Sequence, residues 1–79
     1  MKLNSIATQT IPRGSKFIAL YGDGSGAQLF MTDKKGNLFG HDGKPRDSEP
    51  EAYLMDSCFT WWIKLPNSYK LWFEQKENP

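Results

Sequence analysis

Two tryptophans with lysines close by are the side chains of this chain best suited to molecular contact. Lys64 follows Trp62 by two positions, and Lys70 precedes Trp72 by two. An indole ring buries a large apolar area and keeps an N–H donor, so tryptophan is frequent at the centre of protein–protein contacts. If both rings point away from the core, they form a binding patch, and two facing lysines favour an anionic partner surface. The alternative is that the N-terminal arm or another part of a barrel covers both rings.

The same combination of aromatic rings and cations also fits single-stranded nucleic acid. Bases stack on the rings, and the ammonium groups follow the phosphate backbone. The residues that could do this are Tyr53, Trp62, Trp72, Lys16, Lys64 and Lys70. Against it stand a formal net charge of only +1 and nine acidic residues, because a nucleic-acid-binding domain is usually strongly basic. Nucleic acid is therefore the second choice of partner, after a protein.

A charged stretch in the middle of the chain offers a further contact region. Residues 41–51 contain acids, bases, glycine and proline but no large apolar side chain. The plain role of such a stretch is solvation. Its functional alternative is an adaptable loop at the rim of the tryptophan patch, since loops on a rigid sheet often carry binding residues. The rim residues that we expect are Asp42, Arg46, Asp47 and Glu49.

The sequence shows no constellation typical of catalysis or metal binding. It has 1 histidine, His41, and 1 cysteine, Cys58, without the paired ligand spacing of a zinc site. Its apolar neighbour Phe59 favours Cys58 as a small core residue. The glycine-rich stretch 22–26 lacks the Lys-Ser/Thr pair of a phosphate-binding loop, so it predicts a flexible hairpin loop. We therefore predict no enzymatic activity, no cofactor and no metal.

The composition describes one small soluble domain, residues 1–79. It is 38% hydrophobic and 24% charged. A chain of this size buries a single small core, which leaves little room for a deep catalytic pocket. A lone cysteine forms no intramolecular disulfide, which favours a cytoplasmic location. No apolar run approaches the length of about 18 residues that a membrane span needs, so we expect no membrane partner.

Turn signals in the first half of the chain predict an antiparallel meander. An arm or weak edge strand is expected over residues 1–11. The meander occupies residues 12–40, with strands over 16–21, 27–32 and 38–40 separated by turns that contain glycine. Residues 41–51 form a loop. One short helix over 49–56 stays an open alternative, because Ser48 and Glu51 have the spacing of a capping box and Pro50 suits a first helical position.

The second half of the chain is rich in aromatic side chains. Within residues 52–74, alternation of apolar with other residues predicts two strands, 59–65 and 69–73, that form a hairpin. Their pairing places Trp61 inside and both Trp62 and Trp72 outside. Residues 75–79 are expected to fray. The expected core is Phe17, Ala19, Leu29, Phe39, Phe59, Trp61, Ile63, Leu65 and Leu71.

These elements together predict the fold class. We expect a mainly β domain, or a β-rich α+β domain with one short helix. Its five or six strands form a small antiparallel sheet that is partly rolled into a barrel.

Three landmarks resemble a family of small phage- and prophage-encoded domains of unknown function. That family has a P-x-x-G turn, an apolar strand and a closing T-x-W-x-x-L-P motif. The corresponding segments here are residues 12–15 with Gly14 one place early, 18–21, and 60–66, so the resemblance spans roughly residues 11–66. Trp61 and Lys64 stand where the family usually has histidine and proline. The resemblance implies a phage or prophage accessory protein and no known active site.

The resemblance and the composition together lead to one functional hypothesis. We expect a non-enzymatic, phage-derived binding module in the host cytoplasm that docks on a host or viral protein and inhibits or redirects it. Inhibition of a bacterial defence complex, of the anti-CRISPR or anti-restriction kind, is its sharpest form. A single-stranded nucleic-acid-binding domain and a homo-oligomeric assembly protein are the alternatives.

Overall fold

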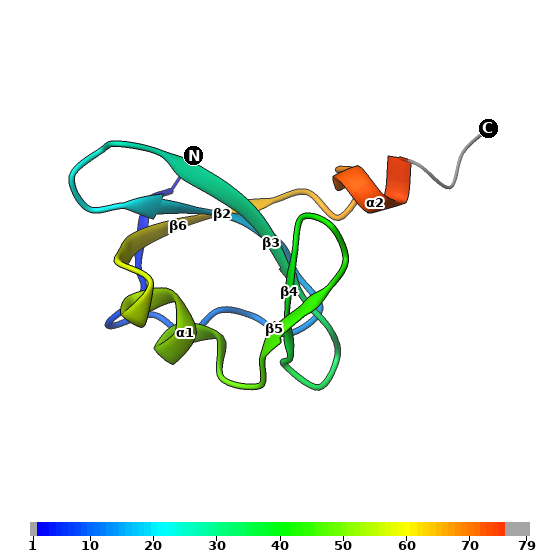
Figure 1. Cartoon of the computed structure of the whole chain (residues 1–79), viewed down its shortest axis with the longest axis horizontal. Coiled ribbons are helices and arrows are strands. Elements are labelled where there is room, and N and C mark those ends of the chain that lie inside the picture. The colour runs from blue at the N-terminus through cyan, green and yellow to red at the C-terminus, as the bar shows by residue number, and fades with distance from the viewer. Residues whose placement is uncertain (1, 76–79) are drawn as a thin grey trace.

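The computed structural model describes residues 2–75 and is organised around one six-stranded antiparallel sheet (Figure 1). The strand order is β1-β6-β2-β3-β4-β5. The strands are β1 (Asn4–Ser5), β2 (Lys16–Tyr21), β3 (Ala27–Thr32), β4 (Leu38–Gly40), β5 (Pro45–Asp47) and β6 (Phe59–Leu65), and the helices are α1 (Pro50–Asp56) and α2 (Trp72–Gln75). The prediction of a mainly β, antiparallel fold is confirmed, although the sheet stays open and does not close into a barrel.

The meander predicted over residues 12–40 is present as β2, β3 and β4. Each strand pairs antiparallel with the next. In the β3–β4 turn, Asp33 Oδ1 accepts hydrogen bonds from the backbone N–H groups of Lys35 and Asn37, as aspartate commonly does in tight turns. The predicted edge strand within residues 1–11 is also present, as the two-residue β1 beside β6.

The stretch predicted as a loop, residues 41–51, contains the strand β5. It forms a hairpin with β4, in which the Gly40 N–H donates to the Lys44 carbonyl. The alternative of a short helix is confirmed in α1. Its first helical residue is Pro50, and its N-cap is Glu49 rather than Ser48. The Glu51 carboxylate accepts a hydrogen bond of 2.8 Å from the Ile11 N–H, which ties α1 to the N-terminal segment.

One face of the sheet, here called the inner face, carries the main core. The side chains are Ile6, Ile11, Phe17, Ala19, Phe30, Leu38, Leu54, Phe59 and Trp62, with Tyr21 and Tyr53 packed against them. Aromatic rings make much of this core: Phe17 stacks on Phe30 with ring centroids 5.8 Å apart, and Phe59 meets Phe30 edge-on at 5.6 Å. Helix α1 and the N-terminal segment lie under this curled face, whereas α2 lies outside it (Figure 1).

A bulge in β6 decides which aromatic side chains reach the inner face. Leu20 pairs with Trp61 and Tyr21 pairs with Phe59, so Thr60 is an extra residue without a partner on β2. An extra residue reverses the side-chain alternation beyond it. Gly22 makes room for it, since a Cβ there would lie 2.5 Å from Thr60 Oγ1. Both Phe59 and Trp62 therefore point inward.

The prediction that Trp62 points outward is consequently wrong. Its side chain is 5% exposed, meets Phe17 edge-on at 6.2 Å and donates from Nε1 to the Gln9 carbonyl at 3.3 Å. The alternative prediction, that the N-terminal arm covers this ring, is confirmed for Trp62. Cys58 is also corrected, because it is exposed rather than part of the core.

The predicted core is confirmed at some positions and wrong at others. The buried ones are Phe17, Ala19, Phe59, Leu65 and Leu71. The half-buried ones are Leu29, Phe39, Trp61 and Ile63, which lie on the opposite face of the sheet. The reason in β3 and β4 is the register: Phe17 pairs with Phe30, and Phe30 with Gly40, which turns Leu29 and Phe39 away from the inner face.

The hairpin predicted over residues 52–74 does not form. Strand β6 is present as predicted, but it lies between β1 and β2. At Trp61 and Trp62 the edge of β6 that a hairpin partner would use is occupied by β1, so Phe73 and Trp72 cannot pair there as predicted. After a turn in which the Tyr69 N–H donates to the Pro66 carbonyl, the chain forms α2 instead. The predicted fraying of residues 75–79 is wrong at Gln75, which is the last residue of α2 and donates its N–H to the Leu71 carbonyl. Residues 76–79 lie outside the described residues.

The helices are short: α1 has 7 residues and α2 has 4. Over residues 2–75, no helix has the length and apolar character needed to cross a membrane.

Replacing Cys58 by glycine is expected to stabilise the fold. Cys58 follows α1 with φ of 71°, a conformation that costs a residue with a Cβ about 1–2 kcal/mol, while glycine adopts it freely. After allowing for the greater freedom of glycine in the unfolded chain, we expect Cys58→Gly to raise the free energy of unfolding by about 0.5–1 kcal/mol. Urea denaturation measures this. Cys58→Ala is the control, because it keeps the Cβ, and a gain of equal size there would contradict the explanation.

Candidate functional site

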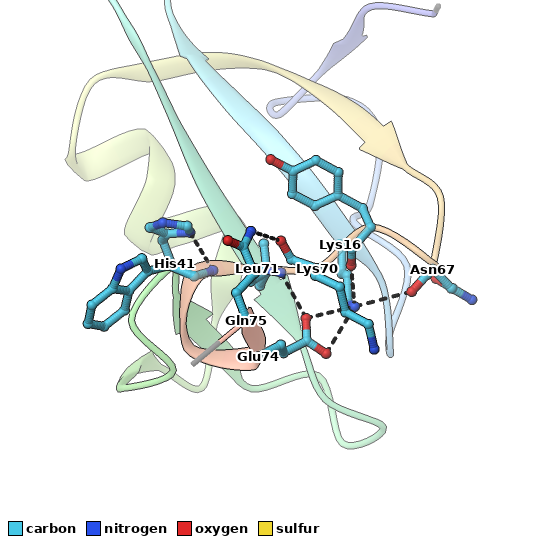
Figure 2. A network of polar contacts seen from close by, with 9 residues as sticks. Lys16, His41, Asn67, Lys70, Leu71, Glu74 and Gln75 are labelled. Carbon is cyan, nitrogen blue, oxygen red and sulfur yellow. Dashed lines mark hydrogen bonds and ion pairs between the residues drawn. The ribbon is translucent and has the colours of Figure 1, made fainter. Parts of the chain in front are cut away.

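The C-terminal segment, residues 66–75, is held against the sheet by Lys16 (Figure 2). Lys16 Nζ donates to the carbonyl oxygens of Asn67 at 3.1 Å and Tyr69 at 2.6 Å. It also forms an ion pair with Glu74, at 2.8 Å from Oε1. Lys16 is the first residue of β2. The three contacts of its ammonium group therefore fix the segment at the N-terminal end of that strand.

Glu74 completes this anchor from the other side. Its Oε1 accepts a hydrogen bond of 3.0 Å from the Leu71 N–H at the start of α2. The hydrogen bond from Lys16, helped by the Leu71 N–H and the positive charge nearby, holds the pKa of the Glu74 carboxyl below its ordinary value. Both side chains of the ion pair are largely covered, and Leu71 between the anchors is fully buried.

The far end of the segment rests on the turn between β4 and β5. The Trp72 N–H donates to His41 Nδ1 at 3.2 Å, and the two rings lie 6.3 Å apart. Phe73 lies directly over Gly43, where a Cβ would come within 2.8 Å of the phenyl ring. Gly43 also has φ of 81°. Glycine is thus required there both by the backbone and by the ring above it.

This arrangement displays Trp72 beside a charged pair. The indole is 43% exposed. Arg46 and Asp42 form an ion pair at 3.2 Å, and the Arg46 guanidinium covers Gly40. The hydrogen bond from the Lys44 N–H keeps the pKa of Asp42 below its ordinary value, and the hydrogen bond and charge of Arg46 add to this effect. The Asp42 carboxylate is therefore ionised at neutral pH. We call His41, Asp42, Arg46 and Trp72 the Trp72 patch.

A shallow hollow adjoins the Trp72 patch. Its volume is about 450 Å³, and its walls are Ala27, Gln28, Leu29, Phe30, Gly40, His41, Asp42 and Arg46. Apolar strand residues form one side and the charged turn forms the other. Such a mixed, open depression suits contact with a side chain of another macromolecule more than enclosure of a small substrate.

The structure brings together only part of the predicted binding residues. Trp72, Asp42 and Arg46 meet in the Trp72 patch, as described above. Lys70 is exposed in the same C-terminal segment, and its carbonyl accepts a hydrogen bond from Gln75 Nε2.

The remaining predicted residues lie elsewhere. Trp62 is buried and Tyr53 packs from α1 against the inner core. Lys64 pairs with Phe17 across β6 and β2, so the predicted pairing of Lys64 with Lys70 is wrong. Asp47 is the last residue of β5 and Glu49 is the N-cap of α1, and Asp47 Oδ1 accepts a hydrogen bond from the Glu49 N–H.

Sequence reasoning missed the anchors of this site. Lys16 was considered only as a phosphate contact, and His41 only as a catalytic or metal-binding side chain. The role of Lys16 cannot be predicted from the residues around it, because its partners are more than fifty positions away in the chain. Gly43 carries no local signal beyond its turn.

The side chains at this site are suited to binding another molecule by contact. Within residues 2–75, no three His, Cys, Asp or Glu side chains lie close enough together to hold a metal ion. His41 and Cys58 line different surface hollows. Tryptophan and arginine, which meet here, are the residue types that most often dominate protein–protein contacts.

Comparison with protein-family models, with curated proteins and with solved structures finds no match for this chain. The resemblance to a phage family stays a prediction.

The charge of Glu74 is expected to stabilise the docked C-terminal segment. Because its pKa is lowered in the folded state, the contribution is present above pH about 4.5, the ordinary value, and is lost as the pH falls through the lowered one. We expect Glu74→Gln to reduce the free energy of unfolding by up to about 1 kcal/mol at pH 7, since the pair is partly solvated, and by nothing near pH 2.

Chemical denaturation at the two pH values measures this difference. The matched control is Glu49→Gln, which removes an exposed carboxylate at the N-cap of α1 and shows what the loss of a surface carboxylate elsewhere does to the same curves. If Glu74→Gln still lowers the free energy of unfolding at low pH, the side chain stabilises the segment by its shape and hydrogen bonds, and not by its charge.

Proposed function

We propose that this chain is a non-enzymatic protein-binding module whose contact surface is centred on Trp72. The observation that carries the proposal is a large indole, 43% exposed, on a segment that is fixed at both ends. Exposed tryptophans that become covered on binding often dominate the binding free energy.

The anchoring of the segment matters for affinity. A contact residue on a mobile loop loses conformational freedom on binding, and that loss reduces the affinity. Here Lys16 and Glu74 hold one side of α2, and His41 and Gly43 meet the other side. The backbone around Trp72 is therefore ordered before a partner arrives.

The charges beside Trp72 favour an interface with selectivity. Arg46 and Asp42 form a pair at the surface, so a partner can accept from the guanidinium or donate to the carboxylate at the rim of the contact. Arginine is frequent in such positions because its planar head makes several hydrogen bonds.

The partner that we propose is a host or viral protein that the module inhibits or redirects, with a bacterial defence complex as the sharpest case. The small size, the predicted cytoplasmic location and the resemblance to phage-encoded domains support this part of the proposal. The nucleic-acid alternative loses support, because its aromatic platform needed Trp62, which is buried in the inner core.

Replacing Trp72 by alanine is expected to weaken binding about 30-fold, which corresponds to about 2 kcal/mol. The backbone hydrogen bond to His41 survives this change, but more than half of the indole is covered, so we expect the free energy of unfolding to fall by about 1–2 kcal/mol. Binding is therefore compared on chains shown to be folded. The measurement is retention of proteins from a nuclease-treated bacterial lysate on the immobilised chain, followed by titration of the retained protein.

The matched control is Met55→Ala, which removes a similarly exposed apolar side chain, 46% exposed, from α1. A protein held by the wild type and by Met55→Ala but lost from Trp72→Ala supports the proposal. Equal retention by all three chains contradicts it. Recovery of nucleic acid alone, from untreated lysate, would favour the nucleic-acid alternative.

A further inference from the structure

The face of the sheet opposite the core is also apolar. Directly paired residues of antiparallel strands share a face. Ile18 pairs with Leu29 on one side and with Ile63 on the other, and Leu20 pairs with Trp61. Met31 pairs with Phe39. We call these residues the outer face: Ile18, Leu20, Leu29, Met31, Phe39, Trp61 and Ile63.

Only one end of the outer face is covered within the described residues. Lys16 shares this face, since it pairs with Met31 and Leu65, and its contacts place the C-terminal segment over that end. Helix α1 packs on the inner face through Leu54. All seven outer-face side chains remain half-buried.

The strands have the composition of a sheet that is covered on both sides. Residues 17–21 of β2 are apolar or aromatic without interruption, and so are Leu29 to Met31 in β3. A sheet with one solvated face usually alternates apolar with polar residues, whereas continuous apolar runs are typical of strands buried on both faces. Within residues 2–75, the C-terminal segment covers one end of the outer face and leaves the rest of it open to a further cover.

The charge distribution indicates which cover fits. None of the seven outer-face residues is charged or can donate or accept a hydrogen bond, apart from the N–H of Trp61. The charged neighbour Lys16 is already paired with Glu74 under the C-terminal segment. A second outer face is complementary to the first, because two such faces bury no unpaired charge. A nucleic acid would find no free cation among these side chains.

The size of the outer face is at the lower end for a specific dimer. Four strands at about 4.8 Å spacing and five residues at about 3.3 Å give roughly 19 by 17 Å, or roughly 300 Å² per copy before side-chain relief is counted. Two such faces give roughly 600 Å² in total, so side-chain relief and the rim must supply the remainder of the about 1,000 Å² that a specific interface needs. Such an area suits a reversible, micromolar association.

We propose that two copies of this chain associate through their outer faces in a twofold-symmetric dimer. Two twisted sheets pack face to face at about 10 Å, with their strands about 30° apart. In a twofold interface the same patch is used on both copies. The Trp72 patch belongs to the C-terminal segment and the β4–β5 turn, so the dimer presents it twice. This inference uses a different surface from the Trp72 patch, although Leu29 of the outer face also lines the neighbouring hollow, and it stands or falls without the proposed protein-binding site.

Sedimentation and concentration-dependent NMR test the dimer on the purified chain alone. We expect the average mass to rise toward twice the monomer mass between about 10 μM and 1 mM. Over the same range, amide shifts should change at β2, β3, β4 and β6. These wild-type shifts locate the interface even if a variant fails to fold.

Ile18→Lys is the interface variant, because Ile18 lies between Leu29 and Ile63 at the centre of the outer face. We expect it to weaken association about 100-fold or more, since each copy would bury an unpaired ammonium. Met55→Lys on α1 is the matched control and should leave association unchanged.

Three results would overturn the inference. The first is a chain that stays monomeric up to 1 mM. The second is a dimer whose shift changes map to α1 or to the Trp72 patch. The third is a folded Ile18→Lys chain that dimerises like the wild type.

Discussion

The extra residue in β6 is the constraint on which the rest of the structure depends. Thr60 has no partner on β2, so the alternation of inward and outward side chains along β6 shifts by one residue at this point. Phe59 can then stack on Tyr21 at 4.3 Å while Trp62 fills the space beside Phe17. Trp61 and Ile63 are turned to the outer face as a direct result. The composition of both faces thus follows from one inserted position, and Gly22 is the residue that leaves room for it.

Local patterns in the sequence predicted the strands well and the faces poorly. Turn residues and apolar runs were enough to place β2, β3, β4 and β6, because these signals act over a few residues. Parity within β6 could not be predicted, since a bulge has no local signature there and reverses every position beyond it. The strand expected over 69–73 is wrong in part for a topological reason: β1 occupies the edge of β6 at Trp61 and Trp62, where the end of that strand was to pair. The candidate site was half predicted, because Trp72, Asp42 and Arg46 are informative residue types, whereas their convergence depends on Lys16, far away in the chain.

The two faces of the sheet divide the work of stability and contact. The inner face is covered by α1, through Leu54, and by residues 6–11, through Ile6 and Ile11. Within residues 2–75, the outer face receives the C-terminal segment, which is attached by the polar contacts at Lys16, by the burial of Leu71 and by the packing of Phe73 over Gly43. Polar anchors at a surface contribute less than apolar burial. The ion pair of Lys16 with Glu74 makes part of this attachment depend on pH and salt, whereas the burial of Leu71 does not.

The position of β6 between β1 and β2 also bears on how the chain folds during synthesis. The meander of β2, β3 and β4 is complete once residue 40 has left the ribosome, but the edge of β2 that β6 will cover stays open for about twenty-five residues more. At about 5–20 residues per second this delay lasts a few seconds. During that interval the nascent chain exposes an apolar strand edge, which is the kind of surface that other chains can pair with. Chaperone binding to the unfinished meander would shield that edge until residues 59–65 emerge.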